Sequence, residues 1–311
     1  MLCPSSAAIV APKSEPAAGL AQAVRYWIGV DGGGTHTRLR LWERRAADWV
    51  CLGEGQAGPS ALGQGVGQAW RQIGEALAAA AVQAGHAVPH WAQCALGLGL
   101  SGANDPALAQ AFRAADPGCA RLALASDALT GVLGAHGGQP GALLIAGTGS
   151  VALALHADGR QVAVGGWGWL NGDEGSGAWI GKAVMQHAQR ALDHRDPAGP
   201  LAQAIWARCG ASAEALLAWC AESGQARYAS LAPLAFDCAA QDPAAARLLQ
   251  EAVQQLEAMV AAVDPQASLP LVLSGTVAAR LAPQFSAALR ARVVVPQGDA
   301  LDGALRLLQS A

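Results

Sequence analysis

Residues 26–42 read Y-W-I-G-V-D-G-G-G-T-H-T-R-L-R-L-W. An apolar run ends at Asp31, glycines and Thr35 follow, and apolar and basic residues then alternate from Arg38 to Trp42. Such a pattern on either side of a glycine turn is typical of two strands joined by a hairpin. The stretch therefore predicts a hairpin that presents Asp31 at its bend.

A second stretch repeats this organisation. Residues 142–155 read A-L-L-I-A-G-T-G-S-V-A-L-A-L, again an apolar strand, a bend with glycine and threonine, and another strand. Two such hairpins in one chain indicate a duplicated architecture. The chain has 311 residues, which exceeds a usual single domain and favours two domains, each with its own apolar core.

Strand and helix patterns alternate around the two hairpins. Helices are expected at residues 64–85, 128–135 and 300–309, and mainly helical chain is expected up to Val263. Further strands are expected at residues 95–100, 121–125, 269–273 and 293–295. Residues 164–182 combine glycines, tryptophans and two acids in a loop that leads into a helix. The Ala-rich helices between residues 201 and 263 are interpreted as packing elements without chemistry.

The composition argues against several classes of partner. Charged residues make up 14% of the chain and the formal net charge is -3, so the chain lacks the dense positive field that nucleic-acid binding requires. The seven cysteines are odd in number and never spaced C-x-x-C, which favours reduced thiols in a cytoplasmic protein. No apolar stretch reaches the ~20 residues that span a membrane, and residues 1–25 are expected to be a disordered leader.

The first glycine bend is suited to hold the phosphates of a nucleotide, because backbone N–H groups of glycine can approach an anion closely. The candidates there are Gly32, Gly33, Gly34 and Thr35, whose hydroxyl is a further donor. Asp31 could hold a hydrated Mg²⁺ ion, which prefers few carboxylates and several waters. On its own, the same pattern could be only a tight hairpin turn.

The second bend offers another anion site, and two such sites on opposing lobes could clamp one polyphosphate. The candidates at the second bend are Gly147, Thr148, Gly149 and Ser150. Between the two bends, Asp127 directly follows a buried strand, where side chains converge on a cleft between domains. We expect it to be the general base for a substrate hydroxyl, and the alternative is a helix N-cap.

Five motifs in this order resemble one known family, the N-acetylglucosamine kinase and BadF/BadG/BcrA/BcrD ATPase-like group of the sugar kinase, Hsp70 and actin superfamily. The motifs are G-V-D-G-G-G-T-H-T at 29–37, G-L-S-G at 99–102, S-D-A at 126–128, G-T-G-S at 147–150 and G-G-W-G-W-L-N-G-D-E-G-S at 165–176. The resemblance implies an α/β, two-lobed actin-like ATPase fold built from duplicated ribonuclease-H-like domains. The expected lobes are residues 26–137 plus 296–311 and residues 138–295.

The resemblance also implies a role for individual residues. Asp127 would take the proton from the sugar 6-hydroxyl, Asp31 would lie on the Mg²⁺ side, and the two glycine bends would bind the phosphates of ATP. The strand-end loop Ser274, Gly275 and Thr276 would support the adenosine. The residues that match sugar-site positions are Ser101, Gly166, Trp167 and Asp173, with Glu174 ranked below Asp173.

The sequence departs from the family at two points. The loop that usually supplies an Asn to the sugar reads Gly58-Pro59-Ser60-Ala61-Leu62, so this contact is absent or is made by Ser60. Asn104 and Asp105 could compensate at the second carbon of the sugar. The adenosine loop reads Ser274-Gly275 where Gly-Gly is more usual, a change that adenosine binding should tolerate.

These features predict an ATP- and Mg²⁺-dependent kinase of an amino sugar, with N-acetylglucosamine favoured over glucosamine and N-acetylmuramic acid. One alternative is the activator ATPase of 2-hydroxyacyl-CoA dehydratases, but its bridging iron-sulfur cluster needs cysteines that are scattered here. The other is a non-catalytic regulator that binds sugar or nucleotide. Most of the ten tryptophans are expected in cores, with Trp167 and Trp169 as exceptions. A homodimer is expected from base rates.

Overall fold

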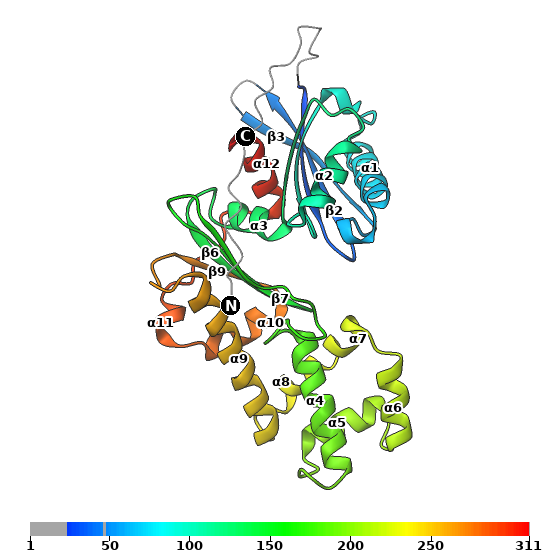
Figure 1. Ribbon diagram of the computed structural model, residues 1–311, viewed down its shortest axis with the longest axis vertical. Coiled ribbons are helices and arrows are strands. Elements are labelled where there is room, and N and C mark those ends of the chain that lie inside the picture. The colour runs from blue at the N-terminus through cyan, green and yellow to red at the C-terminus, as the bar shows by residue number, and fades with distance from the viewer. Residues whose placement is uncertain (1–23, 46–47, 311) are drawn as a thin grey trace.

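The computed structural model describes residues 24–45 and 48–310, and in it two β-sheets lie one above the other (Figure 1). The first sheet has the order β3-β2-β1-β4-β5 and the second the order β8-β7-β6-β9. Almost all of the predicted leader, residues 1–23, lies outside the described residues. No helix in the described ranges is long and apolar enough to cross a bilayer.

The first sheet is covered by helices from both ends of the chain. Its strands are β1 (Tyr26–Gly32), β2 (Thr37–Arg45), β3 (Asp48–Ala57), β4 (Cys94–Leu100) and β5 (Arg121–Ala125). The helices around it are α1 (Val66–Gln83), α2 (Pro106–Ala114), α3 (Asp127–Ala135) and α12 (Ala300–Ser310), with 3-10 turns at Leu62–Gln64 and Trp91–Gln93. Figure 1 shows α12, in red, beside α3.

The second sheet carries the long helical part of the chain. Its strands are β6 (Gly141–Ala146), β7 (Ser150–Leu155), β8 (Gln161–Gly165) and β9 (Leu271–Ser274). The helices are α4 (Gly177–Leu192), α5 (Pro200–Cys209), α6 (Ala213–Ala221), α7 (Gln225–Ala229), α8 (Ala232–Cys238), α9 (Pro243–Val263), α10 (Thr276–Leu281) and α11 (Ala287–Arg290), with a 3-10 turn at Ala282–Gln284.

The two sheets share a pairing pattern that confirms the predicted duplication. In the first sheet, β1 pairs antiparallel with β2 and parallel with β4. In the second, β6 pairs antiparallel with β7 and parallel with β9. Helix α3 follows the first sheet in the chain and contacts strands of both sheets. This mixed α/β arrangement is the predicted two-lobed actin-like fold.

The core of the first lobe explains why the last helix returns to it. Every residue of β4 is buried, as expected for a central parallel strand covered on both faces. A Cβ at Gly97 would lie 1.8 Å from the carbonyl oxygen of Ala304, so α12 approaches β4 as closely as only glycine permits. Arg40 on β2 adds ion pairs to Asp299 (3.0 Å) and Asp302 (2.7 Å) at the start of α12.

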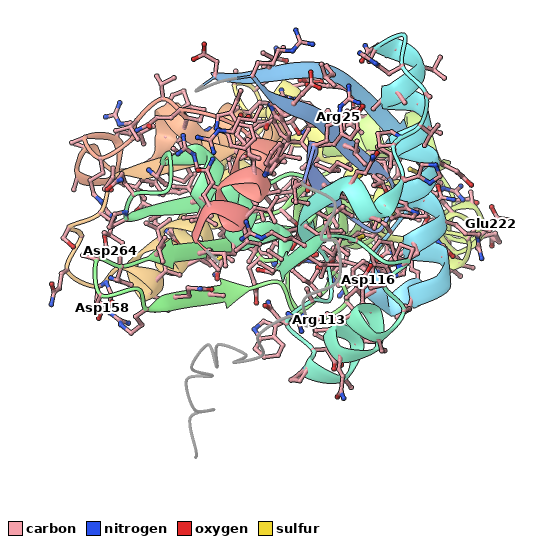
Figure 2. All side chains as sticks on the ribbon, turned by 90° about the horizontal axis from the view of Figure 1, so that it is seen from above. Arg25, Arg113, Asp116, Asp158, Glu222 and Asp264 are labelled. Atoms are coloured by element: carbon pink, nitrogen blue, oxygen red, sulfur yellow. The ribbon has the colours of Figure 1, made fainter. Side chains whose placement is uncertain are left out.

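Three charged side chains of the described residues illustrate the two usual situations of a charge, which are exposure to water and burial with a partner. Asp158 and Glu222 lie at opposite edges of the molecule in the view from above (Figure 2), and both side chains are more than half exposed. Charges stay in water unless they are paired. The buried Asp264 is such a paired case, since it accepts hydrogen bonds from Arg292 and from the backbone of Leu269.

The structure differs from the predicted secondary structure in three respects. Residues 293–295 do not form a strand: only Val293 makes an isolated bridge, to Leu271, and the three valine side chains are exposed. Strands β3 and β8 had not been expected. The first bend is also displaced, because Asp31 lies within β1 opposite Arg38 and the turn itself follows at residues 33–36.

Candidate functional site

A cavity of about 650 Å³ lies between the two lobes, within the size range of small-molecule sites. Both lobes contribute to its wall, and α3 and the start of α12 complete it. The predicted site residues that line it are Asp31, Ser101, Asp127, Gly147, Thr148, Gly149, Ser150, Gly166, Asp173 and Ser274. Segments far apart in the sequence therefore meet at one place.

Asp127 enters the cavity from the point where β5 gives way to α3. The N-cap of α3 is Ser126, whose Oγ accepts the N–H of Leu129 at 3.2 Å, so the alternative that Asp127 is the N-cap is wrong. As the first residue of the helix, Asp127 has Oδ1 fixed by the N–H of Ala128 at 2.9 Å. Burial raises the pKa of the Asp127 carboxyl above its usual range. A carboxylate so held can accept a proton from a hydroxyl group.

Asp31 lies beside an arginine that the sequence analysis had not singled out. Arg38 Nη1 is 3.8 Å from Asp31 Oδ2, and Arg38 Nη2 donates to Asp299 Oδ2 at 2.8 Å. Burial raises the pKa of Asp31, the Arg38 charge lowers it, and the nearby Asp127 carboxylate raises it again. The hairpin register, which pairs Asp31 with Arg38, was the signal that could have identified this residue.

The second glycine bend is fixed by the helix that follows the glycine- and tryptophan-rich loop. The carbonyl oxygens of Gly147 and Thr148 accept the N–H groups of Gly177 (2.7 Å) and Ala178 (3.1 Å) at the start of α4. Ser150 Oγ donates to the carbonyl oxygen of Glu174 at 2.8 Å. The bend, the loop and α4 are thus one connected unit, and exposed Thr148 faces the cavity.

The end of β9 closes against this bend. Ser274 lines the cavity, and Gly275 has a positive φ of 92°. A Cβ on Gly275 would lie 2.4 Å from the carbonyl oxygen of Ala146, so both conformation and space require glycine here. Gly275 and Thr276 do not line the cavity. Gly275 is the N-cap of α10, and Thr276 is the first residue of that helix.

Asp173 is a buried carboxylate that the loop between β8 and α4 contributes to the cavity wall. Its backbone has a positive φ of 55° and it is 5% exposed. Gln225 Nε2, from α7, donates to Asp173 Oδ2 at 2.9 Å, and burial raises the pKa of this carboxyl. Gln225 lies in the helical region interpreted as packing alone, and no sequence motif marks it.

Several predicted residues do not line the cavity. Ser60 is fully buried and accepts a hydrogen bond from Thr37 Oγ1 at 2.7 Å, so its hydroxyl supports the first bend and does not face a sugar. Asn104 is exposed on the loop before α2, and Trp167 is 85% exposed. The remaining predicted residues outside the wall are Gly32, at the end of β1, and Gly33, Gly34 and Thr35 in the turn that follows it.

Comparison with known proteins places these features in a family. Residues 28–300 match the model of the BadF/BadG/BcrA/BcrD ATPase family. A glucosamine kinase of Vibrio cholerae is 32% identical over 283 residues, 91% of this chain and 95% of the relative. An N-acetyl-D-glucosamine kinase of Dictyostelium discoideum is 28% identical over 276 residues, 80% of this chain and 84% of the relative.

The solved structures agree with the sequence relatives. A candidate N-acetylglucosamine kinase from Chromobacterium violaceum shares 44% identity and superposes with a TM-score of 0.85, covering 92% of this chain and 99% of that one. A second, from Porphyromonas gingivalis, shares the fold at 21% identity with a TM-score of 0.63, covering 91% and 98%. The chain belongs to the BadF/BadG/BcrA/BcrD ATPase family.

Proposed function

We propose that this protein is an ATP-dependent kinase that transfers the γ-phosphoryl group to a hydroxyl of an amino sugar. The observation that carries the proposal is the single cavity that brings Asp127, the 147–150 bend and Asp173 together from three separate segments. Relatives named as glucosamine and N-acetylglucosamine kinases support the same activity.

In the proposed mechanism, Asp127 takes the proton from the attacking hydroxyl, which we assign to carbon 6 of the sugar. The hydroxyl then attacks the γ-phosphorus, and the bond from that phosphorus to the bridging oxygen of ADP breaks. Phosphoryl transfer depends on positioning and on neutralising charge. The 147–150 bend would donate backbone N–H groups to the phosphates, and Ser274 would lie beside the adenosine.

The residues present fit a Mg²⁺ ion that is held mainly by substrate. Within residues 24–45 and 48–310, no group of three or more potential ligand side chains forms a ready-made metal cage. Asp31 contributes one carboxylate to the cavity wall, which suits an ion that keeps several waters and binds phosphate oxygens. When bound, Mg²⁺ would neutralise part of the negative charge on the phosphates of ATP.

The sugar would lie between Asp127 and Asp173. Asp173 accepts from Gln225 Nε2 and is also hydrogen-bonded by the backbone of Ser150 and of Gly168, and the lone pairs that remain on its two oxygens would accept from ring hydroxyls. Ser101 and Gly166 extend this wall, whereas Trp167 would have to move to reach the sugar. N-acetylglucosamine is our favoured substrate, with glucosamine and N-acetylmuramic acid as the alternatives.

A coupled ADP-release assay with Mg²⁺-ATP tests the proposal against glucosamine, N-acetylglucosamine, N-acetylmuramic acid and glucose. We expect an amino sugar to give the highest kcat/KM. Phosphorus NMR of the product, compared with authentic 6-phosphates, identifies the hydroxyl that reacts. Absence of sugar-dependent ADP release with every compound would remove the kinase proposal.

The pKa that limits kcat/KM on the acid side of the pH profile should be higher than about 3.9, the usual value for Asp. Asp127 must be ionised to accept a proton, and burial raises its pKa, so kcat/KM should fall as the pH drops through this raised value. The buried Asp31 and Asp173 shift in the same direction. A kcat/KM profile that stays flat down to pH 4 would contradict this account of the base.

Gln225→Met should raise KM for the sugar about tenfold and change kcat much less. Methionine keeps the length of the side chain but removes the amide that orients Asp173, a hydrogen bond to a charged group. Gln203→Met on α5 is the matched control, since Gln203 binds only a backbone carbonyl far from the cavity. Equal KM values for the two variants would remove Gln225 from the site.

We also propose that the lobes comprise residues 26–137 plus 296–311 and residues 138–295. Support comes from α12, which packs on β1, β4 and α3 of the first lobe. The cytoplasmic location and the homodimer stay predictions.

A further inference from the structure

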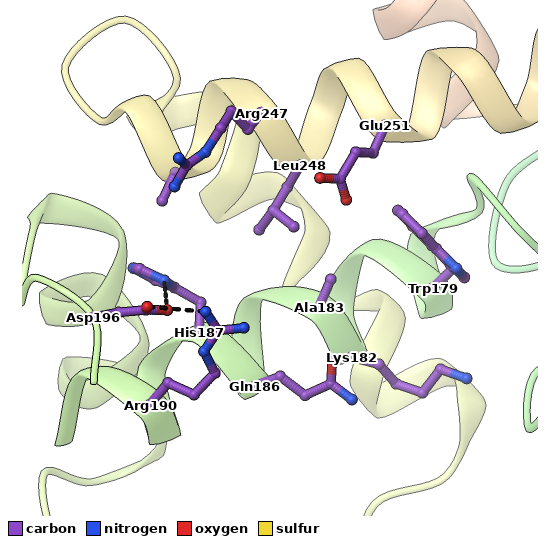
Figure 3. Close-up of a pocket in the computed structure, with 11 residues that line it drawn as sticks. Trp179, Lys182, Ala183, Gln186, His187, Arg190, Asp196, Arg247, Leu248 and Glu251 are labelled. Carbon is purple, nitrogen blue, oxygen red and sulfur yellow. Dashed lines mark hydrogen bonds and ion pairs between the residues drawn. The ribbon is translucent and has the colours of Figure 1, made fainter. Parts of the chain in front are cut away.

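A second cavity, of about 590 Å³, lies between helices α4 and α9, in the helical part of the second lobe (Figure 3). Its polar wall is made chiefly by Lys182, Gln186 and Arg190 of α4 and by Arg247 and Glu251 of α9. The spacings of three or four residues place each set on one helix face. Helices α4 and α9 bury apolar residues on other faces. The faces that border this cavity are mainly polar.

The cavity has more positive than negative charge, although the chain as a whole is negative. Lys182, Arg190 and Arg247 stand against Asp196 and Glu251, while the formal net charge of the chain is -3. Asp196 accepts from Arg190 Nη2 at 2.9 Å and lies 3.3 Å from His187 Nδ1. Within the described residues, Arg247 and Glu251 take part in no ion pair or side-chain hydrogen bond.

Figure 3 shows how these groups are divided between the ends of the cavity. Arg190 and Arg247 lie at one end, on opposite helices, together with His187 and Asp196. Glu251 and Trp179 lie at the other end, and Leu248 lies between. Two guanidinium groups from opposite sides suit a phosphate group. An aromatic ring beside a carboxylate and an amide suits a hydroxylated ring.

His187 is a nearly buried side chain at the end of the cavity that holds Arg190 and Arg247. Its side chain is 9% exposed, and its Nε2 atom has no hydrogen-bond partner among the residues that the structure describes. Buried polar atoms nearly always have a hydrogen-bond partner, and an exception needs a structural explanation. Nε2 itself is closed off from the cavity, so His187 positions Asp196 beside Arg190 and does not contact the ligand.

We propose that the α4–α9 cavity is a second binding site, for a sugar phosphate. Arg190 and Arg247 hold the phosphate, and Trp179, Gln186 and Glu251 contact the sugar. An amino-sugar phosphate fits best, because Glu251 can accept from the N–H of an amine or of an acetamide as well as from a hydroxyl. That this ligand is a product of the enzyme rests on the proposed function, in which glucosamine is one of the candidate substrates.

The second site is too far from the first for one ligand to occupy both. Arg190 follows the N-cap Ser176 by 14 residues of α4, which corresponds to about 21 Å along the helix. Lys182 connects the two sites, since its Nζ donates to the carbonyl oxygens of Trp169 and Leu170 (3.0 Å) in the loop that carries Asp173. Lys182 lies at the end of the cavity that holds Trp179 and Glu251, so a sugar there that draws Lys182 away from these carbonyls loosens the loop and lowers turnover without competing with the sugar substrate.

Calorimetric titration with glucosamine 6-phosphate tests the site directly and needs no turnover. Arg247→Gln should weaken one binding event at least about tenfold, whereas Asp173→Asn should leave that event unchanged. Arg71→Gln is the matched control, because Arg71 is an exposed helical arginine of the other lobe that makes no ion pair or side-chain hydrogen bond with the residues that the structure describes. Binding that Asp173→Asn abolishes and Arg247→Gln preserves would place the ligand in the interlobe cavity and overturn the proposal.

Two further measurements separate the parts of the proposal. Inorganic phosphate should bind about tenfold more weakly than the sugar phosphate, and equal affinity would overturn the assignment of a sugar. In the ADP-release assay, glucosamine 6-phosphate should inhibit the wild type non-competitively with the sugar substrate, and Arg247→Gln should lose this inhibition with its basal rate unchanged. If no sugar is phosphorylated, the proposed function fails while the titration still decides the second site.

Discussion

Asp127→Asn should lower kcat about 10²- to 10⁴-fold, the usual contribution of a general base. Asparagine keeps an oxygen for the N–H of Ala128, which holds the side chain in place, but it cannot accept the proton of the sugar hydroxyl. Binding of sugar and nucleotide should therefore persist while phosphoryl transfer almost stops. Steady-state ADP release and a separate sugar titration measure the two effects.

The same variant should not lose stability, which separates chemistry from folding. Burial raises the pKa of Asp127 in the folded state, so its contribution to folding is favourable below the unfolded pKa and is lost as the pH rises through the folded value. At neutral pH the ionised carboxylate is thus a cost that Asn removes, and Tm should be equal or higher. Asp158→Asn, at the exposed edge of the molecule (Figure 2), is the control. Near-normal kcat in Asp127→Asn would mean that another group is the base.

The architecture was predictable because the full pattern of each hairpin lies within one short stretch of sequence. Apolar alternation on both sides of a glycine bend specifies two strands, and both hairpins form as expected. Strand β3 escaped prediction because Gly53 and Gly55 lower its strand propensity. The structure requires these glycines, since a Cβ at Gly55 would lie 1.9 Å from the carbonyl oxygen of Ala76 in α1. Close approach of a helix is a tertiary effect that the strand sequence does not encode.

The valines at 293–295 illustrate the opposite error. Three β-branched residues in a row favour a strand, but a strand forms only where a neighbour accepts its hydrogen bonds. Here Val294 donates to Leu271 and the chain then leaves the sheet toward α12. Val295 is consequently 87% exposed.

Within the site, acidic residues in motifs could be singled out from the sequence, and their partners could not. Asp31, Asp127 and Asp173 lie in recognisable motifs and all line the cavity. Gln225 has no motif and reaches Asp173 across 52 residues of sequence, so only the folded chain reveals it. Ser60 had been placed by alignment with a missing Asn, yet its burial beside Thr37 makes it part of the support of the first bend.

Asp173→Asn should lower kcat/KM for the sugar about 10- to 100-fold for each ring hydroxyl that the carboxylate binds. The substitution removes the charge but keeps the shape and still offers an oxygen to Gln225 Nε2. The loss should appear mainly in KM, because the proposed contact exists in the ground state as well as in the transition state. Initial rates over a range of sugar concentrations, at saturating ATP, measure it.

Glu174→Gln provides a stringent control, because the two acids are adjacent in the chain and only one lines the cavity. Glu174 uses its backbone carbonyl to accept the hydroxyl of Ser150, an interaction that the change to Gln does not touch. Its kcat/KM should therefore stay within about twofold of the wild type. Equal losses in both variants would indicate that the general negative charge of the loop matters, and not a contact from Asp173. A loss confined to Asp173→Asn would place the sugar against this one carboxylate, opposite the base that activates its hydroxyl.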